Sequence, residues 1–406
     1  MATPQERRRV ASALRLRRQR RLAALLGLTA LAIAAAVLSA GGGSSASHRA
    51  AAKVKAVLPS GGPLSPASVG GLAALWAPQN VVASQPGTAA AYEAAARLPG
   101  LPGYLLIADR GNNRILVVDS QGKTVFLYPT PADVAAGRKL IYNDDTFVVP
   151  GGQALIANEE DNHAIVEVGL ADHSLKVLFG HPGELGPGPT HLHTPDDAYA
   201  LPDGSFTVAD AYNCRILFVK AGRILHEYGR SEVCRHDPPR YFGAVNGDTP
   251  VPGGGVLVSE IPGNWIDEIG PEGRLVFSVR APVSYPSDPQ PLPGGRILLA
   301  DYATPGHVLI MDHAGNVLWR YGPSQGYGRL DHPSLAMGLP NGDIAINDDY
   351  RNRVLVIDPR TNKIVWKYGH TEVPGNGPGH LNTPDGMDFI PAGPRGGPDY
   401  AAVVHP

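Results

Sequence analysis

Positive charge is scarce beyond the start of this sequence. Residues 1–21 carry eight arginines and one glutamate, a sum of +7, whereas the whole chain of 406 residues has a net charge of −2. The remainder therefore carries −9, and an acidic body of this kind does not favour a nucleic-acid partner. The sequence also lacks an HExxH zinc motif, and its glycine-rich stretches, such as 253–255, lead into no helix, which argues against a phosphate loop.

Long helical patterns are missing as well. Gly and Pro together make up 88 of the 406 residues, about 22%, against an average near 12%. So many helix breakers exclude a mainly helical protein and favour short strands joined by turns. The glycines have no three-residue period, which excludes collagen, and recurring Val, Ile, Leu and Tyr argue against global disorder.

One uncharged run of 19 residues occupies positions 22–40. At about 1.5 Å per residue it spans about 28 Å, close to the thickness of a bilayer core. Arginines crowd its N-terminal side, so the positive-inside rule predicts a cytoplasmic N-terminus and an external remainder. A cleaved signal peptide is the alternative. No cysteine follows the run, which argues against a lipoprotein, and residues 41–75, rich in Gly, Ser, Ala and Pro, indicate a flexible linker.

A short pattern returns six times in the rest of the chain. Each copy is a β-rich run that ends in a small residue followed by an acid or amide. The copies lie at 105–109, 154–158, 206–210, 256–260, 297–301 and 343–348. Turn signals and further apolar runs around each copy predict four strands in about 48 residues. Radial packing of such sheets covers their apolar faces, so the sequence predicts an all-β, six-bladed β-propeller.

Seven blades are the alternative, because 383–390 begins another copy and 400–404 could be its second strand. In a six-bladed ring, 383–390 would instead pair with the first blade, and 76–97 would be an incomplete or displaced first strand. The expected organisation is a cytoplasmic basic tail (1–21), a transmembrane signal-anchor (22–40), a flexible linker (41–75) and the propeller (76–406). This organisation predicts a single-pass protein of the cell membrane.

Two segments, ADRGNNRILVVDSQGK at 108–123 and NDDYRNRVLVIDPRTNK at 347–363, resemble NHL repeats, and so does the glycine-rich approach at 375–384. The strands at 317–319 and 364–366 are similar to repeats of quinoprotein-like propellers. The resemblance covers about residues 100–390 and implies a propeller. It implies no single activity, because such propellers include lyases, lactonases, sulfotransferases and binding scaffolds. A quinone cofactor would rest only on Trp319 and Trp366, which more often anchor one blade to the next.

Acids recur where each inner strand is expected to begin. Aligned copies place four of them at one position in successive blades: Asp145, Asp197, Asp248 and Asp288. Inner strands line the channel of a propeller, so these carboxylates should surround one mouth of it. Close like charges need compensation, and Ca²⁺ or another divalent cation with oxygen ligands would supply it. Alternatively, each Asp caps its own turn. Neighbouring residues expected to face a ligand there are Asp144, Asp196, Asn246 and Asp385.

Histidines are expected near the same mouth. His191 and His193 lie in the connection between the second and third copies, and His332 opens the sixth blade. These three could bind a ligand or hold zinc, as in amidating lyases, and His193 or His332 could act as a catalytic group, as in arylsulfotransferase-like propellers. None of those family patterns is matched residue by residue. Because His181 and His191 are repeated ten residues apart as His370 and His380, a loop-docking role is the alternative.

The only two cysteines are Cys214, in a turn between strands, and Cys234, in the loop after an outer strand. Both loops should fall on one face, and the expected compartment is oxidising, so a disulfide worth about 3 kcal/mol is predicted. Two free thiols are the alternative.

The sequence thus favours a membrane-anchored, extracytoplasmic propeller that binds a small molecule, carbohydrate or protein at its axial His/Asp-rich face, with or without a divalent cation. A propeller enzyme (a sulfotransferase, lyase or lactonase-like hydrolase) working at the same face is the main alternative. A structural partner in an envelope complex is the third, and it predicts an exposed apolar patch.

Overall fold

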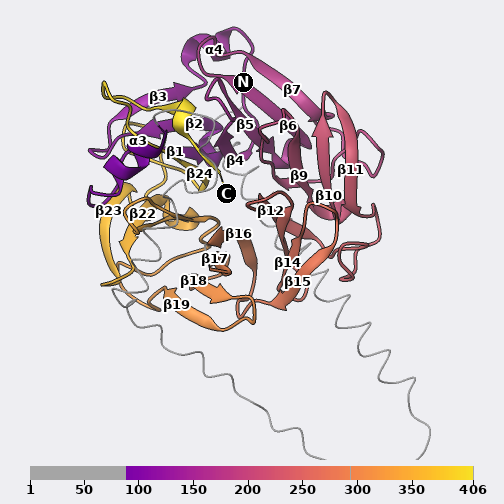
Figure 1. The fold of residues 1–406 in the computed structure, drawn as a ribbon. Helices are drawn as coiled ribbons and strands as arrows, with labels where there is room; N and C mark the ends of the chain where they lie inside the picture. The colour runs from indigo at the N-terminus through magenta and orange to yellow at the C-terminus, as the bar shows by residue number, and fades with distance from the viewer. Residues whose placement is uncertain (1–87, 293, 406) are drawn as a thin grey trace, which may run out of the picture. The chain divides into compact units, whose positions relative to one another are not determined.

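Six four-stranded antiparallel sheets surround a common axis in the computed structural model, which describes residues 88–292 and 294–405 (Figure 1). The prediction of a six-bladed propeller is therefore confirmed. The predicted span at 22–40 and the linker at 41–75 lie outside the described residues, and no helix among those described is long and apolar enough to cross a bilayer.

Each blade begins at the axis with its inner strand and ends with its outer strand. In that order, the blades are: blade 1, β24 (Pro384–Ile390), β1 (Tyr104–Asp109), β2 (Arg114–Val118) and β3 (Thr124–Tyr128); blade 2, β4 (Asn143–Val148), β5 (Ala154–Glu159), β6 (Ala164–Gly169) and β7 (Leu175–Gly180); blade 3, β8 (Pro195–Asp197), β9 (Phe206–Asp210), β10 (Arg215–Lys220) and β11 (Arg223–Gly229); blade 4, β12 (Val245–Pro250), β13 (Val256–Glu260), β14 (Trp265–Ile269) and β15 (Leu275–Arg280); blade 5, β16 (Pro286–Leu292), β17 (Arg296–Asp301), β18 (His307–Asp312) and β19 (Val317–Tyr321); blade 6, β20 (Ala336–Gly338), β21 (Ile344–Asp348), β22 (Arg353–Asp358) and β23 (Lys363–Gly369).

The last strand closes the ring. β24 pairs antiparallel with β1, from Tyr104 opposite Ile390 to Asp109 opposite Pro384, so the C-terminal segment completes the first blade as expected. The expectation of a displaced strand at 76–97 is wrong for its described part, because Thr88–Ala95, an alanine-rich segment, forms helix α3. Tyr400–Ala402 forms a short 3₁₀ helix, η5, and not the second strand of a seventh blade.

Short turns between the second and third strands are built alike in four blades. The 3₁₀ helices η1 (Arg110–Asn112), η2 (Glu160–Asn162), η3 (Ala211–Asn213) and η4 (Asp349–Arg351) each follow a strand that ends in an acid. The start of an inner strand and the end of its antiparallel neighbour lie at the same edge of a blade. These turns therefore gather around one mouth of the ring, together with the loops that enter the inner strands. The remaining helix, α4 (Pro131–Ala135), lies in the connection between blades 1 and 2.

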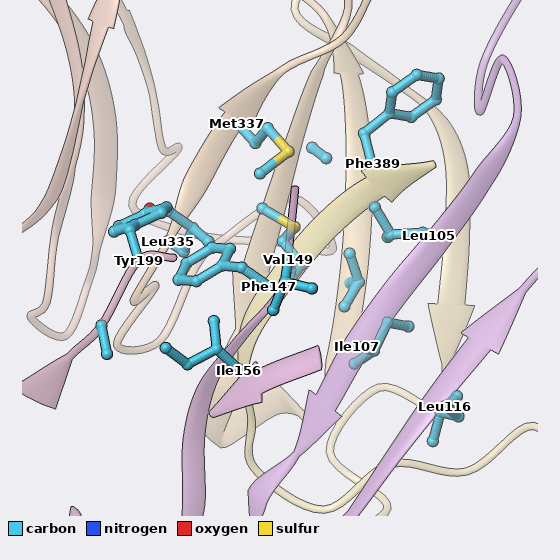
Figure 2. Close-up of a cluster of buried hydrophobic side chains, with 14 of the residues drawn as sticks. Leu105, Ile107, Leu116, Phe147, Val149, Ile156, Tyr199, Leu335, Met337 and Phe389 are labelled. Carbon is cyan, nitrogen blue, oxygen red and sulfur yellow. The ribbon is translucent and has the colours of Figure 1, made fainter. Parts of the chain in front are cut away.

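Buried apolar side chains of blades 1, 2 and 6 pack together with Tyr199 of blade 3 (Figure 2). Phe147 of blade 2 stacks on Tyr199 of blade 3, with ring centroids 4.0 Å apart. The amide of Gln290, from blade 5, donates to the Tyr199 hydroxyl across the ring at 3.3 Å. His405, near the end of the chain, contacts Phe147 with ring centroids 5.7 Å apart and is hydrogen-bonded to Asp388 at 2.9 Å. These contacts connect blades 2, 3 and 5 with His405.

Candidate functional site

A repeated bulge shapes the start of the inner strands. In β4, Asn143 pairs with Glu159 and Thr146 pairs with Ala157, so the two residues between these pairs oppose a single residue, Asn158, on the neighbouring strand. Similar shifts occur in β8, β12, β16 and β24. Side chains of consecutive strand residues normally point to opposite faces, and a bulge re-aims them. As a result, the neighbouring carboxylates of Asp144 and Asp145 are both buried.

Strand pairing corrects one part of the predicted register. In each blade, one residue of the inner strand pairs with the last residue of the second strand. Asp145, Asp197 and Asp288 each lie two residues after that pairing residue, whereas Asp248 lies three residues after it. The common position is therefore right for three acids and wrong for Asp248. Gly247 occupies the shared place in blade 4, and a Cβ there would lie only 2.7 Å from Cδ of Pro289. No side chain fits at this close approach of two inner strands.

The structure nevertheless brings all four acids together, and we call Asp145, Asp197, Asp248 and Asp288 the axial carboxylates. Their exposure does not exceed 4%, and Asp248 is completely buried. Neither carboxylate oxygen of Asp248 has a hydrogen bond of ordinary geometry, and neither does Oδ1 of Asp145. Four acids in this state require either protons or a cation.

The pKa values of the axial carboxylates respond to burial and to one another. Burial is the largest influence and raises the pKa of all four. The charge of Asp288 raises the pKa of Asp145 further, and that of Asp248 raises the pKa of Asp197. Asp288 itself, next to Asp385, has a pKa raised to about 8. The cluster therefore favours uptake of positive charge at neutral pH.

A second group of polar residues lies above the axial carboxylates, nearer the mouth. Arg110 is its centre: its guanidinium lies 3.0 Å from carboxylate oxygens of both Asp144 and Asp385 and also pairs with Glu160. The amide of Asn246 donates to Asp196. We call Arg110, Asp144, Glu160, Asp196, Asn246 and Asp385 the mouth ring. Asp144, Asp196 and Asp385 are also buried, with 4–7% of their surface exposed.

Sequence reasoning missed Arg110, Glu160 and Asp349. Each directly follows the acid that ends a second strand, so the repeat register held the signal, although the residue type changes from blade to blade. Asp349 accepts a hydrogen bond from the hydroxyl of Ser334 at 3.0 Å. Its burial raises its pKa, and the charge of Asp385 adds to that effect.

Aromatic rings and histidines form the outer rim. His193 lies beside Tyr212, with ring centroids 5.3 Å apart, and His332 lies beside Tyr350, with ring centroids 4.4 Å apart. Tyr212 and Tyr350 are 38% and 40% exposed. The Nδ1 atom of His332 is 2.7 Å from a carboxylate oxygen of Asp331. The two histidines belong to blades 3 and 6, which face each other across a six-membered ring, so the structure does not bring together the expected trio with His191.

His191 has a different setting. It stacks on His181 with ring centroids 4.2 Å apart, and His380 stacks on His370 in the same manner at 4.1 Å. A Cβ on Gly375 would lie 2.8 Å from the His380 ring, so these rings pack against the glycine-rich loops that carry them. The duplicated geometry favours loop docking over ligand binding.

The cysteines are joined. Cys214, the residue that ends η3, forms a disulfide with Cys234, and their Cα atoms are 5.3 Å apart. The bridge attaches the loop after β11 to the turn of its own blade.

Comparison with known proteins gives distant structural likenesses only. The sequence matches no protein-family model and no curated protein. Among solved structures, a protein of unknown function from Bacteroides caccae is 18% identical, with a TM-score of 0.48 over 71% of this chain and 98% of that one. A streptogramin B lyase is 15% identical (TM-score 0.47; 74% of this chain, 90% of that one), and a virginiamycin B lyase from Staphylococcus aureus is 16% identical (TM-score 0.40; 60% and 73%).

Proposed function

We propose that this protein is a binding module that holds a divalent cation on its axial carboxylates and a small polar ligand, such as a carbohydrate, at the mouth above them. The observation that carries the proposal is the convergence of four buried acids, of which Asp248 has no hydrogen bond of ordinary geometry to either carboxylate oxygen. The predicted signal-anchor at 22–40 would hold the module on the outer side of the cell membrane.

The donor set determines the kind of cation. All four axial carboxylates offer oxygen, and hard cations such as Ca²⁺ bind six to eight oxygens at about 2.3–2.6 Å. A cation on the axis would face several carboxylates at once, which offsets both their mutual repulsion and the cost of their burial. The mouth ring is less suited to a second cation, because Arg110 already pairs with Asp144, Glu160 and Asp385.

The rim and the mouth ring together provide a surface for a polar ligand. Exposed rings of Tyr212 and Tyr350 offer flat apolar contact, and the mouth ring beneath them offers donors and acceptors for hydroxyl groups. Ligand sites commonly combine apolar walls with a few convergent polar groups. A carbohydrate, with C–H faces and many hydroxyls, has the matching chemistry.

The affinity for Ca²⁺ tests the first half of this proposal. Full-length protein stripped with EDTA should bind CaCl₂ in a calorimetric titration with a stoichiometry of one, and Asp248→Asn should weaken binding at least tenfold. Asp161→Asn, at an exposed position in η2, is the control and should bind as the parent does. Absence of binding by Ca²⁺, Mg²⁺ and Mn²⁺ to the parent protein would remove the proposal.

A specific contact favours enzymatic activity as the second candidate. Asp331 holds Nδ1 of His332 at 2.7 Å, so the other ring nitrogen, Nε2, is oriented as a general base or acid would be. If His332 is catalytic, His332→Gln should abolish turnover of a substrate found in a glycan or lactone panel while leaving its binding unchanged. If His332 only packs on Tyr350, the same variant should alter binding alone.

A further inference from the structure

The fourth blade departs from an ion pair that other blades repeat. In blades 1, 3 and 6 the acid that ends the second strand pairs with an arginine five residues later. These pairs are Asp109–Arg114, Asp210–Arg215 and Asp348–Arg353, at 2.6, 2.7 and 2.7 Å. In blade 4 the corresponding acid is Glu260, and Trp265 occupies the place of the arginine. Glu260 is fully buried, so its charge needs a different partner.

Two other side chains approach Glu260 instead. His236, from the loop after β11, places Nδ1 2.7 Å from Oε1 of Glu260 and stacks flat on Trp265, with ring centroids 3.9 Å apart. Asp267, in β14, places a carboxylate oxygen 4.0 Å from the same histidine nitrogen. The positions that correspond to Asp267 in the other five blades hold buried aliphatic residues: Leu116, Val166, Leu217, Leu309 and Leu355.

Asp267 is an acid whose near neighbours are Glu260, Ser278 and His236. It is fully buried, and neither of its carboxylate oxygens has a hydrogen bond of ordinary geometry. An aliphatic side chain fills this place in every other blade, so the fold itself does not call for a polar group. The two buried carboxylates of Glu260 and Asp267 lie beside one histidine, and a cation shared by all three side chains would offset the charges of both acids.

We propose that His236, Glu260 and Asp267 form a second metal site, one that takes a zinc-like transition-metal ion. One ligand atom from each residue lies within 4.8 Å of the others. Tetrahedral zinc with bonds of about 2.0–2.1 Å separates its ligand atoms by about 3.3 Å. The two distances from the histidine nitrogen, 2.7 and 4.0 Å, fall on either side of that value, so small side-chain movements suffice. One nitrogen and two oxygens suit zinc, whereas Ca²⁺ takes oxygen alone.

The surroundings hold this group in place and leave one side open. The side chain of His236 is 25% exposed, which leaves room for a water molecule as fourth ligand. Cys234, two residues before it, is joined to Cys214 and fixes the loop. The hydroxyl of Ser278 lies 3.4 Å from Nε2 of His236, where it can orient the imidazole ring. The site is separate from the axial carboxylates and does not depend on the proposed function.

Zinc titration of matched variants tests the proposal. Full-length protein stripped of metal is titrated with ZnCl₂ and its metal content is measured by elemental analysis after gel filtration. We expect one tightly bound zinc in the parent protein and in Asp248→Asn, in which only the axial site is altered. His307→Gln, which removes a histidine 3.7 Å from an acid at the related place in blade 5, should also retain it. His236→Gln and Asp267→Leu should each weaken zinc binding at least tenfold and abolish the zinc-induced rise in melting temperature.

The Asp267→Leu variant distinguishes loss of zinc binding from loss of folding, because leucine is the residue that blades 1, 3, 5 and 6 have at this position. Its metal-free melting temperature should equal or exceed that of the parent. Equal zinc content and affinity in the parent, His236→Gln and Asp267→Leu would overturn the proposal. So would a parent protein that binds no zinc, because the three side chains would then share only protons.

Discussion

Replacing Asp288 with asparagine should stabilise the metal-free protein at neutral pH. Asp288 is buried on the axis and has a pKa of about 8 in the folded chain, against about 3.9 for an aspartate in an unfolded chain. Asparagine has the size of the protonated acid and tolerates the positive φ of 39° at this position. The substitution therefore removes the titration and keeps the geometry.

The magnitude follows from proton linkage. Between pH 5 and pH 7 the folded chain keeps the proton on Asp288 and the unfolded chain has lost it, so stability falls as pH rises. One such carboxyl lowers the free energy of unfolding by about 1.4 kcal/mol per pH unit, or about 3 kcal/mol over this range. The Asp288→Asn variant does not lose stability in this way. The difference in free energy of unfolding between the variant and the parent should therefore increase by about 3 kcal/mol from pH 5 to pH 7.

Urea unfolding in EDTA at pH 5, 6 and 7, followed by tryptophan fluorescence, measures the difference. Adding Ca²⁺ at one hundred times its dissociation constant should restore about 2.7 kcal/mol to the parent and much less to the variant, which lacks one ligand. Stability curves that run parallel in the parent and the variant would refute the reasoning, because they would show that Asp288 ionises normally in the folded state.

Three further predictions concern the frame of the site. Replacing Cys214 and Cys234 together with alanine should lower the free energy of unfolding by about 3 kcal/mol under non-reducing conditions, and an unchanged urea midpoint would contradict this. Arg110→Met should cost about 3–5 kcal/mol at pH 8 but less at pH 5, where the acids it leaves unpaired take up protons; a loss independent of pH would argue against the pairing. Gly386→Ala, whose Cβ would lie 2.5 Å from a backbone atom of β4, should cost about 1–3 kcal/mol in urea unfolding, whereas Gly377→Ala, with only a distant contact at 3.8 Å, should be neutral.

The repeat pattern was sufficient to predict the architecture. Six recurrences of a strand that ends in an acid or amide predicted six sheets, because each sheet needs neighbours to cover its apolar faces. The pairing of 383–390 with the first blade was open in the sequence, since a seventh blade would start in the same way. Only the register between β24 and β1 decided it.

The site was predictable in outline and not in detail. Asp145, Asp197 and Asp288 could be placed on the axis from their repeated positions, but Asp248 is offset by one residue, and Gly247 stands at the shared position, where a Cβ would be too close to Pro289 of the next blade. Strand periodicity carries no information about a contact between blades, so aligned copies cannot reveal it.

What the sequence by itself determined is periodic: strand positions, the turn residues between them and the acids that recur in register, because each depends on neighbours along the chain. What the tertiary structure decided is convergence. Arg110, in η1, meets acids of two inner strands, and His236 meets Glu260 and Asp267 in the adjacent blade, over gaps of tens to hundreds of residues. Such contacts depend on how the ring closes and how loops fold over it, and no local pattern encodes those distances.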